Sequence, residues 1–275
     1  MNKPAAQITK DELRVITTAI WNRYGIDFRN YENTSLCRRV SRLIDRFDLD
    51  SVYALWRKFL YEQDFIQVFI DEITVGLTEL FRNPGMWAFL GKNFLKPLPS
   101  DHSLHIWHAG CSTGEEVYSL LITLIEYKRL NQSKIIATDL SHEALQAAQA
   151  GIYDHSLWTK YNENYCEFSE LKRDLGTYTQ NLEQGFQMNK DLRNRIIFSL
   201  HNLVRDPIPA NLDWIFCRNV LIYFDDKLKL DVLKKFYEAL KPGGLFIMGF
   251  YDYIAFPQEY FKLAYPDYKI FIRNP

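Results

Sequence analysis

One short segment of the chain combines small residues, two glycines and two adjacent acids, a pattern suited to binding a ligand. The apolar run at residues 105–109 leads into Gly-Cys-Ser-Thr-Gly at 110–114, and the helical pattern that follows begins with Glu115 and Glu116. This order predicts a strand, a tight turn and a helix N-terminus. In doubly wound α/β folds such a turn lets a ligand approach the bare backbone beside unpaired helical N–H groups. The segment therefore indicates a cofactor site.

The glycine spacing and the two acids indicate the kind of cofactor. Gly110 and Gly114 are four residues apart, unlike the dinucleotide fingerprint, and no Lys follows Gly114 as in a phosphate-binding P-loop. Carboxylates at a helix start repel a pyrophosphate but attract an amino group or a sulfonium. S-adenosylmethionine carries both groups and is the cofactor that we predict. The alternative is that Glu115 and Glu116 only complement the helix dipole.

An acid ends the next apolar run. Residues 133–138 predict a second strand, Asp139 follows it directly, and residues 142–148 have a helical pattern. At the end of the second strand of such folds, an acid can accept hydrogen bonds from ribose hydroxyls. Asp139 could instead cap the following helix, but Ser141 could cap it equally well and leave Asp139 free.

Polar residues also follow a third predicted strand, at residues 214–217. Arg218 and Asn219 come where this strand should end, and Tyr223 lies four residues beyond Asn219. Ligands in open parallel sheets bind at the carboxyl ends of the strands, so we expect these three side chains to face the pocket.

Three segments together resemble the CheR-type chemoreceptor glutamate methyltransferases, which pass a methyl group from S-adenosylmethionine to glutamate side chains of bacterial chemoreceptors. The segments are residues 77–82, 109–116 and 216–225, and the likeness extends from about residue 10 to residue 272. The resemblance implies that Arg82 and Tyr223 lie near the transferred methyl group. It also implies that the cofactor is contacted by Thr78, Arg82, Glu116, Asp139, Asn202, Leu203, Arg218 and Asn219.

The chain departs from the family pattern near the first of these residues. Gly76 stands where the family usually has Asn, and a lost hydrogen bond of about 0.5–1.5 kcal/mol predicts weaker cofactor binding. Leu80 replaces the first of two Phe residues, and Phe81 is retained. The Gly76 substitution makes a non-catalytic signalling module that binds S-adenosylmethionine conceivable, whereas the intact Arg82 and Tyr223 argue for catalysis. A methyltransferase for another protein or a small acid is a second alternative.

The expected reaction needs no catalytic base. A glutamate side chain has an ordinary pKa of about 4.3, so it is already an anion at neutral pH. Orientation of the reacting groups can then supply several kcal/mol of catalysis. Arg82 could steer the substrate carboxylate or bind the cofactor's own carboxylate, and Tyr223 could donate a hydrogen bond that fixes the substrate oxygen. The alternative is that Arg82 is an ordinary helix surface residue and Tyr223 a core residue.

The predicted fold is α/β, a doubly wound Rossmann-like methyltransferase sheet with an N-terminal small helical domain and a small inserted subdomain. Helical spacing of apolar residues places the helical domain at 1–73, before a catalytic domain at 74–275 that binds S-adenosylmethionine. The inserted subdomain covers about residues 152–194. Beyond it we expect strands at 195–200, 245–250 and 268–272 and a helix at 226–240.

The inserted segment bears on how a substrate is held. Family members carry a small β-subdomain there, and in some of them it binds the carboxyl-terminal peptide of a receptor. Here the segment looks longer and more helical, notably at 167–173, so we expect no peptide tethering. The expected partner is the cytoplasmic helical domain of a chemoreceptor.

Arginines follow one face of a helix in the N-terminal part. Arg38, Arg42 and Arg46 recur every four residues, with Arg39 beside them, and we call these four side chains the arginine ridge. Such a ridge suits an acidic partner, and the resemblance implies that it docks on the glutamate-rich methylation region of the receptor. The alternative is a solvated helix face.

Composition excludes several other classes of protein. The net charge of −1 gives no basic field for nucleic acid, and no apolar run is long enough to span a membrane. The four cysteines are far apart and form no metal-binding pattern, and His102, His105 and His108 are expected to be surface or packing residues. We therefore expect a cytoplasmic, metal-free monomer that does not insert into membranes.

Overall fold

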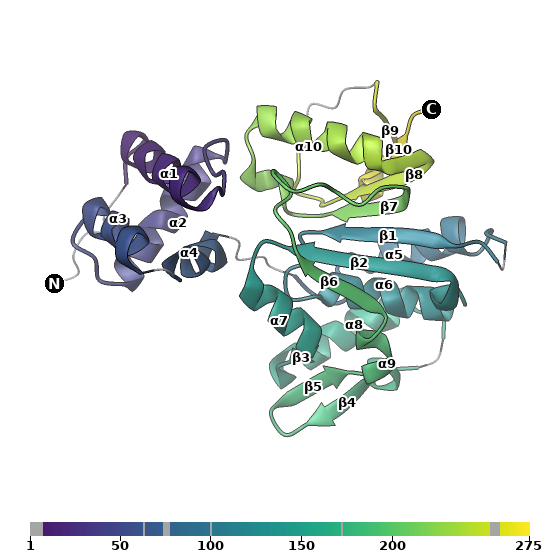
Figure 1. Cartoon of the computed structure of the whole chain (residues 1–275). Coiled ribbons are helices and arrows are strands. Elements are labelled where there is room, and N and C mark those ends of the chain that lie inside the picture. The colour runs from purple at the N-terminus through teal and green to yellow at the C-terminus, as the bar shows by residue number, and fades with distance from the viewer. Residues whose placement is uncertain (1–7, 63, 74–77, 100, 172, 254–258) are drawn as a thin grey trace.

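A computed structural model of the chain describes residues 8–275 apart from 63, 74–77, 100, 172 and 254–258. Its N-terminal part is a bundle of helices that lies beside the rest of the chain (Figure 1). Apolar residues such as Ile16, Val40 and Phe69 are buried between these helices. The helices are α1 (Lys10–Tyr24), α2 (Asn33–Arg46), α3 (Val52–Tyr61) and α4 (Phe65–Ile73).

The remainder is built on a seven-stranded sheet with the order β6-β2-β1-β7-β8-β10-β9. The first five strands in this order, β6, β2, β1, β7 and β8, pair in parallel. Strand β10 pairs antiparallel with both β8 and β9. Its strands are β1 (Leu104–Ala109), β2 (Ser133–Asp139), β6 (Ile196–Leu200), β7 (Leu212–Cys217), β8 (Leu240–Met248), β9 (Phe261–Tyr265) and β10 (Ile270–Arg273). The predicted fold class is confirmed.

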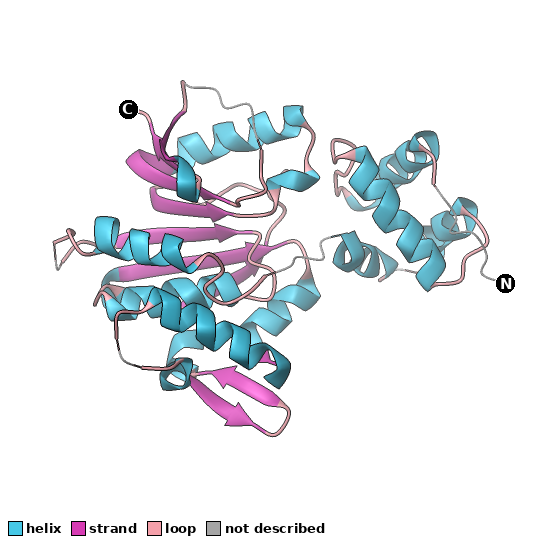
Figure 2. Cartoon of the chain, turned by 180° about the vertical axis from the view of Figure 1, so that it is seen from behind, coloured by secondary structure: helices cyan, strands magenta, loops and turns pink. Residues whose placement is uncertain are grey.

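Alternating side chains give the sheet two buried faces. Ile106 and Phe216 pack on one face, in a cluster shared with α5, α6 and α8, whereas Trp107 and Ile215 pack on the other face against α10. Because both faces are covered, the central strands are almost continuously apolar. Figure 2 shows this layered arrangement from behind. The covering helices are α5 (Pro84–Leu90), α6 (Glu115–Glu126), α8 (Trp158–Phe168) and α10 (Asp226–Ala239).

The inserted segment forms a small antiparallel sheet with the order β3-β5-β4, which extends below the main sheet in Figure 1. The prediction of helical backbone around residues 167–173 is wrong beyond Phe168. Helix α8 ends at this residue, and Ser169 already has extended backbone. The segment does contain a helix, α8, but this helix lies almost entirely before the range in which the sequence predicted it. Its strands are β3 (Ile152–Tyr153), β4 (Thr179–Leu182) and β5 (Gly185–Met188), flanked by α7 (His142–Ala150) and α9 (Lys190–Arg193).

The carboxyl-terminal third differs from the prediction in its details. Strand β8 begins at Leu240, directly after α10, and ends at Met248, so it starts before the expected residue 245 and stops short of residue 250. Strand β9 was not predicted.

None of the helices that the structure describes has the length and apolar character of a membrane-spanning segment.

Candidate active site

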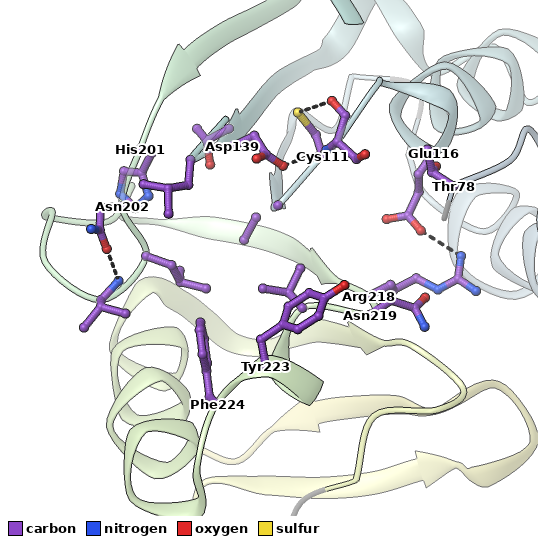
Figure 3. Close-up of a pocket in the computed structure, with 18 of the residues that line it drawn as sticks. Thr78, Cys111, Glu116, Asp139, His201, Asn202, Arg218, Asn219, Tyr223 and Phe224 are labelled. Atoms are coloured by element: carbon purple, nitrogen blue, oxygen red, sulfur yellow. Dashed lines mark hydrogen bonds and ion pairs between the residues drawn. The ribbon is translucent and has the colours of Figure 1, made fainter. Parts of the chain in front are cut away.

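A cavity of about 980 Å³, including its open mouth, lies at the carboxyl ends of the central strands. All eight residues predicted to contact the cofactor line it, and so does Tyr223. Figure 3 shows Asp139 and Asn202 on one side of this cavity and Glu116, Arg218 and Asn219 on another. The structure thus brings together side chains from segments more than a hundred residues apart.

The glycine turn after β1 forms one wall of the cavity. Gly110 has a φ of +84°, and a Cβ at this position would collide with Val220. The backbone N–H groups of Gly110 and Cys111 both donate to the carbonyl oxygen of Thr138, at 2.8 and 2.9 Å. Glycine is needed here because it tolerates both the left-handed backbone and the close approach.

Asp139 ends β2 and is held by two backbone donors. Its Oδ2 accepts the Ser112 N–H at 2.8 Å and its Oδ1 accepts the Ser141 N–H at 3.0 Å. Ser141 caps α7 through Ala144 N, so Asp139 is left free of the capping role, as the sequence suggested. Burial raises the pKa of Asp139, and backbone N–H donors, first those of Ser141 and Ser112, oppose that rise. Each carboxylate oxygen keeps a further lone pair for a ligand hydroxyl.

The two adjacent acids at the start of α6 have different surroundings. Glu115 is 4 % exposed, and its carboxylate accepts hydrogen bonds from Thr113 Oγ1 at 2.7 Å and Tyr161 Oη at 3.2 Å. Burial raises the pKa of Glu115. Glu116 lines the cavity instead. Only Glu116 therefore fits the ligand-binding role that we predicted for both acids.

Glu116 is the centre of an ion-pair network that the sequence did not predict. Its Oε2 lies 2.7 Å from Arg218 Nη1, and its Oε1 lies 3.3 Å from His108 Nδ1. Arg218 Nη2 also donates to Asn83 Oδ1 at 2.6 Å. Burial opposes ionisation, but the Arg218 guanidinium and His108 outweigh it and lower the pKa of Glu116. His108 is a packing residue, stacked on Phe216 with centroids 4.4 Å apart, but it also reaches the site.

The turn that carries Arg82 has a strained backbone. Phe81 and Asn83 have φ values of 50° and 57°, which residues other than glycine rarely adopt. Phe81 anchors the turn, because its N–H donates to Ser119 Oγ at 2.7 Å and its ring stacks on Phe168. Such strain is often found at functional sites. Gly76, for which we predicted weaker cofactor binding, lies outside the described residues.

The segment between α1 and α2 contributes directly to the cavity. Tyr31 lines it and packs edge-on against Phe224. The backbone of the same segment pairs with the turn of Tyr223, since Glu32 N–H donates to the Tyr223 carbonyl at 2.8 Å. Tyr31 was not predicted from the sequence, because the residue carries no motif and reaches the site only through the packing of the two parts of the chain.

Three members of the arginine ridge are exposed, whereas Arg39 contacts Tyr223. Arg39 is half-buried, with Nη2 3.2 Å from Tyr223 Oη and its guanidinium 4.8 Å from the centroid of that ring. Arg46 is exposed and pairs with Glu72 at 3.0 Å. Arg38 and Arg42 are exposed, and no ion pair of theirs occurs within the described residues.

The loop after β6 forms another wall of the cavity. Asn202 Oδ1 accepts the backbone N–H of Val204 at 3.0 Å, and Lys235 Nζ donates to the Val204 carbonyl at 2.6 Å. Leu203 adds an apolar lining residue. Among the described residues there is no cluster of three or more His, Cys, Asp or Glu that could hold a metal ion.

The family model described as "CheR methyltransferase, SAM binding domain" matches residues 76–269, and the model of the all-alpha CheR domain matches residues 11–74. The protein named Cher3 of Pseudomonas putida is 33% identical over 94% of this chain and 95% of its own length. A chemotaxis protein methyltransferase of Listeria monocytogenes is 31% identical over 92% of this chain and 94% of its own. The corresponding protein of Salmonella typhimurium is 30% identical over 86% and 81%.

Proposed function

Because the chain belongs to the CheR methyltransferase family, we propose that it transfers a methyl group from S-adenosylmethionine to glutamate side-chain carboxylates of a bacterial chemoreceptor. The family makes the chain an S-adenosylmethionine-dependent methyltransferase of chemotaxis; the receptor as acceptor is our proposal. The observation that carries it is the single cavity that gathers Asp139, Glu116, Arg82 and Tyr223 beside the arginine-bearing helix α2.

The polar groups of the cavity match the parts of the cofactor. Asp139 offers carboxylate oxygens to ribose hydroxyls, and Glu116 offers one to an ammonium group. The guanidinium groups of Arg82 and Arg218 suit the carboxylate of the methionine part. When bound, S-adenosylmethionine supplies an electrophilic methyl group on a sulfonium.

The remaining catalysis consists of positioning. The acceptor carboxylate is ionised at neutral pH, so the site has no proton to remove before attack. Tyr223 can donate its hydroxyl hydrogen to one acceptor oxygen, and Arg82 can neutralise part of the acceptor's charge and restrict its direction of approach. Orientation of this kind is worth several kcal/mol in model reactions.

The exposed members of the arginine ridge provide the proposed docking surface. Arg38 and Arg42 project into solvent from α2, the helix whose Arg39 contacts Tyr223. A receptor helix bearing glutamates on one face would meet these charges beside the mouth of the cavity. Charge complementarity then brings an acceptor glutamate to the site.

We place the enzyme in the cytoplasm, as a monomer that acts on the cytoplasmic helical domain of the receptor. We also propose that docking through α2 suffices without capture of a receptor's carboxyl-terminal peptide. A transfer rate that does not change when that peptide is deleted from the receptor would support this last point, and a large loss of rate would overturn it.

The proposal is tested by transfer of radiolabelled methyl from S-adenosylmethionine to purified receptor cytoplasmic fragments. We expect label that base treatment releases as methanol, the mark of a glutamyl ester. A matched fragment with its candidate glutamates replaced by glutamine is the control and should remain unlabelled. Label that resists base, or label of equal intensity on the control, would contradict carboxyl methylation.

A further inference from the structure

A buried carboxylate, that of Asp252, lies in the loop that follows β8. Asp252 is 1 % exposed, although its neighbours Tyr251 and Tyr253 are 71% and 76% exposed. Burying a carboxylate costs free energy unless hydrogen bonds compensate. A loop that turns its charged residue inward and its aromatic residues outward therefore needs a structural reason.

The reason is a set of three backbone donors. Asp252 Oδ2 accepts the N–H groups of Asn219 at 2.7 Å and Gly249 at 2.9 Å, and its Oδ1 accepts the N–H of Ile222 at 3.2 Å. Burial raises the pKa of Asp252 to about 6, and the three donors and Arg218 oppose the rise. One carboxylate thus joins the end of β8 to two points of the turn after β7.

That turn carries side chains on which the proposed reaction depends. Asn219, whose N–H donates to Asp252, lines the cavity. Ile222, whose N–H also donates to Asp252, directly precedes Tyr223 in the chain. Asn219 has a φ of +61°, a conformation that costs free energy outside glycine and persists only when its surroundings hold it.

The packing of Gly249 supports the same interpretation. A Cβ built on Gly249 would lie 2.5 Å from Asn219 N and 2.6 Å from Asp252 Oδ2. Only glycine lets the end of β8 approach the turn closely enough for the carboxylate to reach both N–H groups. Two separate features of the chain therefore serve the same contact.

We propose that Asp252 is a positioning residue for methyl transfer, which fixes the backbone of Asn219 and Ile222 and thereby places both the cofactor-facing Asn219 and the hydroxyl of Tyr223. Asp252 does not line the cavity and acts through the turn. The inference rests on the proposed function, because it assigns Asp252 a part in that same reaction.

The test compares Asp252→Asn with a matched substitution near the amino-terminal start of β7, at the other end of the strands from the cavity. Asp213 is also largely buried, and it accepts the His105 N–H and an Lys241 ammonium hydrogen, both at 2.8 Å, away from the cavity. Asp213→Asn therefore removes a comparable carboxylate from outside the site. For both variants we would measure the Kd of S-adenosylmethionine by calorimetry, kcat and KM for transfer, and Tm.

We expect Asp252→Asn to weaken cofactor binding and to lower kcat, with a combined loss of about 10- to 100-fold in kcat/KM. Asp213→Asn should lower Tm by a similar amount and keep the kinetic constants of the wild type. Wild-type Kd and kcat in a folded Asp252→Asn protein would overturn the inference, as would equal kinetic losses in both variants.

A second variant covers the case in which Asp252→Asn does not fold. Gly249→Ala keeps the carboxylate and displaces Asn219 from the other side, so it should show the same joint change in Kd and kcat. Unchanged constants in that variant would overturn the inference. A wild-type protein that binds S-adenosylmethionine but labels no receptor would contradict the proposed function instead, because the calorimetric comparison of the variants needs no acceptor.

Discussion

Replacing Arg39 by Ala should slow methyl transfer without weakening receptor docking, even though Arg39 belongs to the arginine ridge. Its guanidinium is half-buried, donates to the hydroxyl of Tyr223 and lies over that ring, so its position serves the candidate catalytic residue. Arg39 also reaches the carbonyl oxygen of Glu72 at 3.4 Å. The exposed Arg38 and Arg42 remain to attract an acidic helix.

The size of the effect follows from the two contacts to Tyr223. A hydrogen bond with a charged partner is worth about 1.5–3 kcal/mol, and a cation–π contact about 0.5–2 kcal/mol. The same guanidinium makes both contacts, so the values do not add. The backbone hydrogen bond from Glu32 to Tyr223 remains in the variant and limits the movement of the ring. We expect a loss of about 2 kcal/mol in the transition state, which is about 30-fold in kcat.

The assay is steady-state transfer to a receptor fragment at saturating S-adenosylmethionine. Arg39→Ala should lower kcat and leave both the KM for the fragment and the calorimetric Kd of the cofactor close to the wild type. Arg42→Ala is the matched control and should raise the KM for the fragment with little change in kcat. An Arg39→Ala protein with normal kcat and a KM raised as much as that of Arg42→Ala would refute the reasoning.

Three further substitutions test other contacts of the site. Phe81→Ala removes a fully buried ring stacked on Phe168, so urea unfolding should show a loss of about 3–5 kcal/mol, and a loss below 1 kcal/mol would contradict the anchoring role. Gly110→Ala places a methyl group against Val220 at a residue with a positive φ, so calorimetry should detect no cofactor binding. Cofactor binding as tight as in the wild type would contradict this prediction, because it would show that the turn rearranges to accommodate the methyl group. Glu116→Gln leaves the buried guanidinium of Arg218 without its anion and should cost about 3 kcal/mol of unfolding free energy at pH 7. Because the native pKa of Glu116 lies below its ordinary 4.5, this difference should shrink as the pH falls from 4.5 through the native pKa, whereas a difference that is constant with pH would exclude the ion pair as its cause.

The sequence predicted the parts of the site that depend on local pattern. A strand, a glycine turn and a helix start must be neighbours in the chain to form the wall at Gly110, so their order alone is informative. The same holds for Asp139 at the end of β2 and for Arg218 after β7, because the carboxyl ends of parallel strands meet at one edge of the sheet.

Contacts between distant segments could not be predicted in this way. His108 and Arg218 share Glu116 only because β1 and β7 are adjacent in the sheet, and Arg39 reaches Tyr223 only because α2 packs beside the turn. The helix expected at 167–173 failed for another reason. Its residues have the composition of a solvated helix, but helices at surfaces depend on packing, and the buried face of α8 ends at Phe168.

The measurement that tests the central claim most directly is mass-spectrometric mapping of a receptor fragment after incubation with the enzyme and S-adenosylmethionine that carries a deuterated methyl group. The account predicts the intact deuterated methyl on glutamate side chains of the helical methylation region, with the label lost after mild base and absent when Tyr223→Phe and Arg82→Ala are combined. Label on lysine, arginine or cysteine side chains, or a fragment left unlabelled by an enzyme that binds the cofactor, would contradict it.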